Sequence, residues 1–165
     1  MFGDTAAGSI GCVGGAVLRW SLVLFFVGFG LYKFTPQAAA GVAPLMAYSP
    51  VLFWVNPLLG VRGGSDLIGV IEIAMGAAIA LRQLKPLWSA YGSLATSGAL
   101  LITLSFQFTT PGLDPNSSDA RFLAEDLTLF GAALWSSTEA FAAAREHRTG
   151  KSAVALGEAA PELGG

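Results

Sequence analysis

The chain alternates between long apolar blocks and short breaks that are polar or contain proline. Four blocks are each close to the ~20 residues that an α-helix needs to cross a hydrocarbon core of ~30 Å. They cover residues 14–33, 65–84, 88–108 and 122–144. The pattern predicts an all-α membrane protein whose single domain, residues 14–145, is a four-helix transmembrane bundle.

The two ends of the chain differ from the blocks. Residues 1–13 form a Gly-rich leader without a helix signal, and residues 146–165 form a Gly/Ala/Glu tail that we expect to be disordered and cytoplasmic. An alternative for the first block is a cleaved signal peptide, because Ala38, Ala39 and Ala40 follow its apolar run. The first basic residue is Arg19, so the positive charge that a signal peptide carries at its start is missing.

The segment 34–64 is apolar but is interrupted by prolines that exclude a long helix. They are Pro36, Pro44, Pro50 and Pro57. We expect short interfacial helices around residues 37–48 and 50–59, in the first extracytoplasmic loop. The pattern is compatible with a functional lid and with an ordinary hydrophobic connector.

The second block carries an acid in its middle. At helical spacing, one face is small and polar and consists of Ser65, Gly69, Glu72, Gly76 and Ala80. The third block has a similar stripe of Gly92, Thr96, Ala99, Thr103, Gln107 and Thr110. Small residues allow close helix packing, and an ionisable side chain in a membrane avoids lipid. The spacing therefore predicts that Glu72 faces the bundle interior.

Basic residues indicate the orientation. Four spans place both termini on one side, together with Arg19, Arg82, Lys85, Arg145, Arg148 and Lys151, whereas Lys33, Arg62 and Arg121 lie on the other. Because cytoplasmic loops carry the excess of Lys and Arg, we expect both termini in the cytoplasm. The expected partners are the lipid bilayer and another membrane protein or a second copy, the latter packed through glycine-lined faces.

Polar side chains from all four spans fall in the outer half of the predicted bundle when depth is counted at ~1.5 Å per residue. This predicted intramembrane cluster consists of Lys33, Glu72, Thr103, Gln107, Thr110, Arg121 and Asp126. Unpaired charges at such depth are costly, so we expect Lys33 or Arg121 to pair with Glu72, Glu125 or Asp126. The alternative role is a structural network that fixes helix register. Arg19 and Glu139 are expected to reach toward the cytoplasmic interface.

Composition excludes several classes of site. The chain is 53% hydrophobic and 12% charged, with a net charge of −2, so it lacks the strongly basic surface of nucleic-acid-binding proteins. A single cysteine, Cys12, excludes an internal disulfide, and no Cys/His spacing indicates a metal site. No catalytic residue is predicted, and a role without enzymatic activity is favoured.

Several motifs in the same order carry a family resemblance. They are KFTP (33–36), PLMAYSP (44–50), IGVIEI (68–73), TLSFQFTTPG (103–112) and Arg121 followed by Asp126. Over about residues 16–145 the chain resembles the YkgB-like family of bacterial inner-membrane proteins, the reactive chlorine resistance membrane protein family, which is grouped with DoxX-like four-helix proteins. Beyond the predicted cluster, the positions that match the family pattern are Pro44, Ser49, Pro50, Ser105, Thr109 and Pro111.

The chain departs from the family pattern at two places, and these departures predict an altered preference for a ligand or ion if the replaced residues act in the family's function. Gln37, Ala38 and Ala39 stand where the pattern has an aromatic residue, Glu and Ala, and Glu125 stands where it has Lys. The resemblance implies a bacterial plasma-membrane protein linked to tolerance of oxidants such as hypochlorous acid. One cysteine and three methionines argue against direct scavenging by thiol chemistry.

Three functions are compatible with these features. The first is an accessory protein of oxidative-stress defence that has no cofactor of its own and binds a partner or a small lipophilic molecule, such as a quinone, in the polar cluster. The second is a small ion- or proton-coupled transporter in which Glu72 and Asp126 titrate. The third is a non-catalytic subunit of a membrane redox enzyme.

Overall fold

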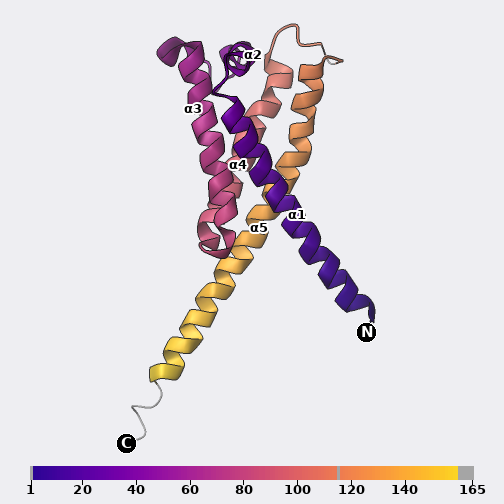
Figure 1. Cartoon of the computed structure of the whole chain (residues 1–165), viewed down its shortest axis with the longest axis vertical. Helices are drawn as coiled ribbons and strands as arrows, with labels where there is room; N and C mark the ends of the chain where they lie inside the picture. The colour runs from indigo at the N-terminus through magenta and orange to yellow at the C-terminus, as the bar shows by residue number, and fades with distance from the viewer. Residues whose placement is uncertain (1, 115, 160–165) are drawn as a thin grey trace, which may run out of the picture.

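The computed structural model describes residues 2–114 and 116–159, with side chains for residues 8–114, 116–118 and 120–149. Its elements are α1 (Phe2–Tyr32), α2 (Pro36–Ala47), α3 (Val55–Ala80), the 3-10 helix η1 (Leu81–Gln83), α4 (Pro86–Thr109) and α5 (Ser118–Ala159). Over this range every element is helical, which confirms the all-α prediction. The long helices α1, α3, α4 and α5 form a bundle, and α2 lies across one of its ends (Figure 1).

The bundle has two distinct ends (Figure 1). At the end that we call the loop end lie α2 and the connection between α4 and α5. At the opposite end, the termini end, η1 connects α3 to α4, and both chain termini point away from the bundle.

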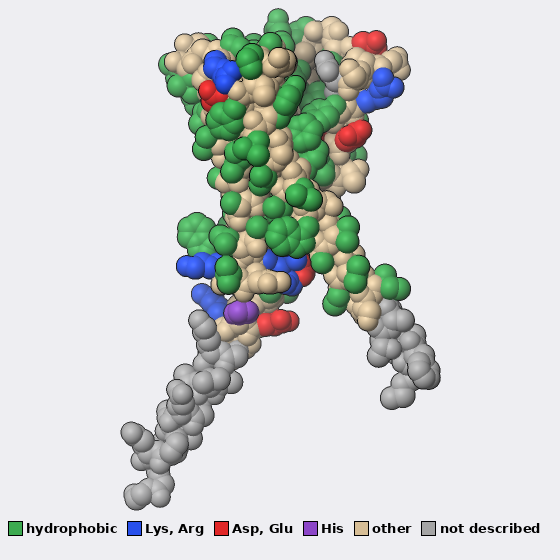
Figure 2. Space-filling model, viewed as in Figure 1, with side chains coloured by type: hydrophobic (Ala, Val, Ile, Leu, Met, Phe, Trp, Pro, Cys, Tyr) green, Lys and Arg blue, Asp and Glu red, His purple; other side chains and the backbone are tan. Residues whose placement is uncertain are grey.

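Three described helices are long and apolar enough to cross a membrane: Gly8–Tyr32, Val55–Gln83 and Pro86–Thr109. Figure 2 shows hydrophobic side chains over the flank of the bundle, with most charged side chains gathered toward its two ends. The chain is therefore a multi-pass membrane protein. Helix α5 covers the fourth predicted block, 122–144, as a helix, and its crossing of the bilayer stays a prediction.

Local sequence signals set several helix starts. The side chain of Thr35 accepts a hydrogen bond from the amide of Ala38 at 3.2 Å, and Pro36 occupies the first turn, as is typical of an N-terminus. Pro86 likewise opens α4. Ser117 accepts a hydrogen bond from the amide of Ala120 at 3.1 Å at the start of α5. Helix α2 confirms the helix expected around 37–48.

The second expected short helix, around 50–59, differs from the structure. Residues 50–54 form turns, in which the hydroxyl of Ser49 accepts hydrogen bonds from the amides of Val51 and Leu52 at 3.3 and 3.2 Å. Helix α3 begins at Val55 and is broken at Gly60, whose φ of 72° lies in the left-handed region that favours glycine. A short helical segment therefore precedes the predicted second span and continues into it after this kink.

The structure corrects both predicted ends. Helix α1 begins at Phe2, so the leader 1–13 is helical from that residue, because extending an existing helix avoids the unfavourable nucleation step. Helix α5 continues to Ala159 through most of the tail 146–165. That stretch contains several Ala and Glu residues, which have high helix propensity. Residues 160–165 lie outside the described residues.

Small residues bring the helices together. A Cβ on Gly69 of α3 would lie 2.6 Å from the carbonyl oxygen of Gly30 in α1, so neither position accommodates a side chain without movement. Between α4 and α5 the hydroxyls of Ser93 and Ser136 are 3.1 Å apart. The apolar core at mid-height contains Leu22, Phe26, Met75, Ile79, Leu100 and Ala133. This close packing fixes the relative height of polar groups on different helices.

Candidate functional site

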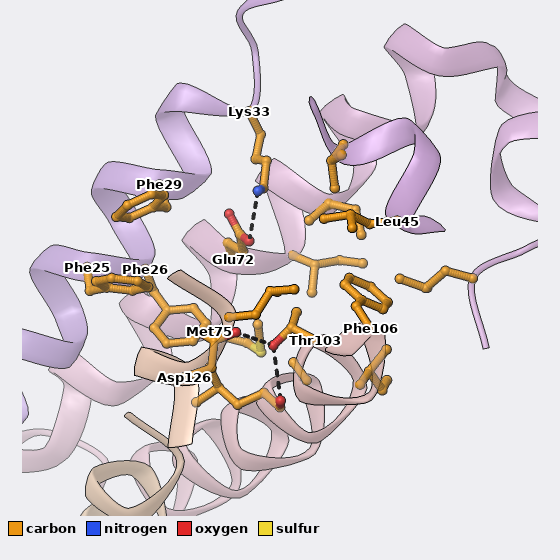
Figure 3. Close-up of a pocket in the computed structure, with 18 of the residues that line it drawn as sticks. Phe25, Phe26, Phe29, Lys33, Leu45, Glu72, Met75, Thr103, Phe106 and Asp126 are labelled. Atoms are coloured by element: carbon orange, nitrogen blue, oxygen red, sulfur yellow. Dashed lines mark hydrogen bonds and ion pairs between the residues drawn. The ribbon is translucent and has the colours of Figure 1, made fainter. Parts of the chain in front are cut away.

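A cavity of about 210 Å³ lies in the loop-end half of the bundle, enclosed by side chains from α1, α2, α3, α4 and α5 (Figure 3). Its lining is mostly apolar. The polar or charged side chains that line it are Lys33, Glu72, Thr103 and Asp126. The structure thus brings four of the seven residues of the predicted cluster to one cavity.

Lys33 and Glu72 face each other across the top of the cavity (Figure 3). Lys33 directly follows α1, and its Nζ lies 3.9 Å from Oε1 of Glu72 in the middle of α3. Both side chains are mostly buried, with 16% and 17% of their surface exposed. The second carboxyl oxygen of Glu72, Oε2, is buried and has no hydrogen-bond partner among the described residues. The pair is therefore an incomplete one, with room for a further donor.

Asp126 and Thr103 form the second polar group of the cavity. Oγ1 of Thr103 lies 2.5 Å from Oδ2 of Asp126 and 3.0 Å from the carbonyl oxygen of Leu100. A hydroxyl has one proton, so it donates to only one of these acceptors at a time. If Thr103 donates to Leu100, a protonated Asp126 can donate to Thr103. The arrangement thus accommodates Asp126 with or without a proton.

Aromatic side chains form much of the remaining wall. They are Phe25, Phe26, Phe29, Phe106 and Phe122. The rings of Phe29 in α1 and Phe122 in α5 have centroids 5.4 Å apart and close one side of the cavity. The sequence prediction missed this wall. Phe25, Phe29 and Lys33 are spaced by four residues and share one side of α1, a signal that could have identified it.

Three residues of the predicted cluster lie outside this lining. Gln107 donates a hydrogen bond to the carbonyl oxygen of Ala120 and so ties the end of α4 to the start of α5. Thr110 directly follows α4, and its hydroxyl is buried without a hydrogen-bond partner among the described residues. Arg121 is exposed and forms no ion pair with a described side chain, so the predicted pairing falls to Lys33 and Glu72.

The residues of the family motifs have mostly structural contacts. Pro44 lies inside α2 and is exposed. Ser49 is buried, and its hydroxyl caps the turn that begins at Pro50. Ser105 donates to the carbonyl oxygen of Ile102 at 2.6 Å. Thr109 ends α4 just before Pro111. Of the departures from the family pattern, Ala38 and Ala39 are buried in α2, while Gln37 and Glu125 are exposed.

A second charged cluster, which we call the arginine cluster, lies at the termini end. Arg19 of α1 and Arg82 of η1 both form ion pairs with Glu139 of α5. The sequence predicts that Arg19 and Glu139 reach toward the cytoplasmic interface, and the structure adds that they contact each other: Arg19 is 8% exposed and shares Glu139 with Arg82. No spacing signal in the sequence indicates this cluster, because Glu139 is 57 residues from Arg82 and 120 residues from Arg19.

The chemistry available in the cavity is binding and proton exchange. An ammonium and two carboxyl groups can donate, accept and relocate protons, and apolar walls exclude water around them. Within the described residues, no three His, Cys, Asp or Glu side chains are grouped so that they could hold a metal ion.

Comparisons with known proteins give one relative. No protein-family model matches the chain, and no solved structure matches it significantly. The chain is similar to the inner membrane protein RclC of Escherichia coli (strain K12), with 25% identity over 123 residues. This match covers 60% of the chain and 62% of RclC, less than two thirds of that relative's length.

Proposed function

We propose that this chain is a bacterial inner-membrane protein that contributes to resistance against reactive chlorine by binding a small lipophilic molecule, or a partner's side chain, in the loop-end cavity. The likeness to the inner membrane protein RclC and the resemblance to the reactive chlorine resistance family support the location and the process. The observation that carries the binding role is the mostly apolar cavity with an incomplete Lys33–Glu72 pair at its top.

The size and walls of the cavity favour a compact apolar ligand. A protein cavity of about 150 Å³ is large enough to bind benzene, so about 210 Å³ accommodates a single substituted ring. Five phenylalanines supply ring contacts, and Lys33, Glu72 and Asp126 supply hydrogen bonds at the edges. A quinone-like head group combines these properties, with a flat apolar body and oxygen atoms at its rim.

The position of the cavity favours a ligand that arrives from the bilayer. Ile71 and Phe122 both line the cavity and are also exposed on the flank of the bundle, at 45% and 38%. Both side chains thus lie between the cavity and the outer surface of the bundle, where a ligand from the bilayer would enter.

Survival under hypochlorous acid tests this proposal. A deletion strain carries the wild type, Glu72→Gln or Lys33→Ala, and membrane levels are compared by immunoblot. We expect both variants to be present and to lose protection. The matched control is Asp66→Asn, which removes the exposed Arg62–Asp66 pair, and it should protect like the wild type. Full protection by Glu72→Gln and Lys33→Ala would contradict the binding role.

A second candidate function is proton-coupled transport, which the presence of two carboxyl groups in one cavity favours. Purified protein in proteoliposomes with a pH-sensitive dye distinguishes the candidates. A transporter should show proton flux that Glu72→Gln abolishes, whereas a binding protein should show none. A non-catalytic subunit of a redox enzyme would instead co-purify with its catalytic partner.

The proposal includes a four-span topology of the DoxX-like kind, in which α5 crosses the bilayer between residues 122 and 144 and both termini are cytoplasmic. Asp126 at the loop end and Glu139 at the termini end both pair with residues of other helices, so α5 has few unpaired charges along this stretch. Reporter fusions after residue 113 and after residue 165 test it. The two fusions should report opposite sides of the membrane.

A further inference from the structure

The arginine cluster has more positive than negative charge. Two guanidinium groups, of Arg19 and Arg82, share the one carboxylate of Glu139. The side chains are 10%, 29% and 28% exposed, respectively. Glu146, the other described acid of this end, forms no ion pair with either arginine. One unit of positive charge therefore remains in a largely buried site.

The height of the cluster matches the head-group region of a bilayer. Arg82 lies in η1, where the chain reverses direction between α3 and α4, and Lys85 and Pro86 follow at once. Aromatic residues mark the same level. Trp20 follows Arg19, and Trp88 lies in the first turn of α4, with exposed fractions of 55% and 64%. Exposed Trp side chains are enriched at membrane–water interfaces, where lipid phosphates also lie.

Both arginines keep an unused donor. The Nε atoms of Arg19 and Arg82 are buried and have no hydrogen-bond partner within the part of the chain that the structure describes. A buried donor without an acceptor is unfavourable, and guanidinium groups match the oxygen geometry of phosphate. The exposed part of the Arg82 side chain, 29% of its surface, is where an acceptor from outside the chain can make contact and compensate the remaining charge.

We propose that the arginine cluster binds the phosphate group of an anionic membrane lipid, with Arg19 and Arg82 as its ligands and Glu139 compensating part of their positive charge. Basic pockets between transmembrane helices are known to take lipid head groups in this way. The proposal is independent of the cavity, which lies in the opposite half of the bundle.

Native mass spectrometry of the purified full chain in detergent tests the site. Phosphatidylglycerol and phosphatidylcholine are offered in equal amounts. The wild type should retain phosphatidylglycerol preferentially, and Arg82→Gln should lower its affinity about fivefold, the effect of one charge contact near a membrane surface. Arg62→Gln is the matched control, because Arg62 lies at the loop end in an exposed pair, and it should retain lipid like the wild type.

A second variant separates binding from structure. Glu139→Gln raises the net charge of the cluster, so it should retain more phosphatidylglycerol than the wild type, whereas a cluster that is only structural predicts no gain. If this variant cannot be purified, the difference in retained phosphatidylglycerol between Arg82→Gln and Arg62→Gln tests the proposal by itself. Equal retention of phosphatidylglycerol by those two variants would overturn the proposal.

Inorganic phosphate distinguishes the source of the ligand. Excess inorganic phosphate should leave the retained phosphatidylglycerol in place if the lipid chains contribute to binding. Displacement of the lipid by inorganic phosphate would overturn the lipid assignment and leave a site for the free anion.

Discussion

The two charged regions of this bundle lie at opposite ends and differ in how completely their charges are paired. Lys33, Glu72 and Asp126 lie around a cavity, with Nζ of Lys33 3.9 Å from Glu72. The second carboxyl oxygen of Glu72 has no hydrogen-bond partner within the part of the chain that the structure describes. Arg19, Arg82 and Glu139 lie in direct contact with one another. The loop-end region thus has open space beside its charges, whereas the termini-end region has charge without comparable space.

The distance between these regions explains why they can act separately. Fourteen residues separate Arg19 from Lys33 in the chain, and thirteen separate Asp126 from Glu139, so each pair spans about 20 Å along its helix. The apolar core of Leu22, Phe26 and Met75 lies between them. A change in one region should therefore leave the other intact, and substitutions can compare their roles.

The largest effect should come from Glu139→Gln. Removing one partner from a buried ion pair typically costs about 3–5 kcal/mol, and here two arginines lose the carboxylate that pairs with both of them. Glu72→Gln, the same chemical change at the loop end, should cost less than Glu139→Gln, because Glu72 lies 3.9 Å from one basic group whereas Glu139 pairs with two. Thermal unfolding in detergent, followed by circular dichroism, measures both. Equal melting temperatures of the two variants would remove the distinction between the regions.

The next effect concerns the glycine contact beside the cavity. Gly69→Ala should destabilise the protein by about 1–3 kcal/mol, because its Cβ would meet the carbonyl oxygen of Gly30 and separate α1 from α3. Gly98→Ala is the matched control. It has open space around its Cβ, and should stabilise α4 by up to about 1 kcal/mol. Denaturant unfolding should therefore show shifts of opposite sign, and a stabilised Gly69→Ala variant would contradict the close packing.

Thr103→Val should have a smaller effect, of about 1–2 kcal/mol, because Asp126 loses its side-chain hydrogen bond. Ser105→Ala is the control, since that hydroxyl bonds only to its own helix and does not line the cavity. For both variants, chemical denaturation measures the free energy of unfolding and the hypochlorous acid assay measures protection. If Ser105→Ala proved as harmful as Thr103→Val in both assays, the special role of the Asp126 contact would be excluded.

The smallest effect on stability should come from Ala99→Leu. Ala99 lines the cavity, and a larger apolar side chain would fill empty space without displacing a charge, so the melting temperature should stay unchanged or rise slightly. Protection against hypochlorous acid should nevertheless fall, because the ligand space is lost. A variant that is stable and fully protective would show that function does not need the cavity.

The sequence anticipated much of the loop-end site because helical periodicity and depth are local properties. The stripe through Ser65, Gly69 and Glu72 predicted an inward carboxyl group, and the structure buries Ser65 and Gly69 and leaves Glu72 facing the cavity. The same counting placed Lys33, Thr103 and Asp126 near that height. Depth alone could not choose between Lys33 and Arg121 as the partner of the buried acids, and the structure leaves Arg121 exposed.

The two chain ends show the limit of composition as a guide. Glycine and alanine near the start, and alanine with charged residues near the end, suggested a loose leader and a disordered tail. Both stretches instead extend the adjoining helices to Phe2 and to Ala159. Propagation of a helix that packing has already nucleated depends on the neighbouring segment as well as on the stretch itself.

The sequence by itself determined the class of the protein, an apolar helical bundle with charged groups at two heights, because hydrophobicity, proline breaks and helical spacing are encoded locally. Only the tertiary structure decided which charges meet. Contacts such as those of Glu139 with Arg19 and Arg82, or of Phe29 with Phe122, join residues far apart in the chain. They depend on the rotation and height at which the helices pack, which close glycine and serine contacts fix and which no single helix specifies.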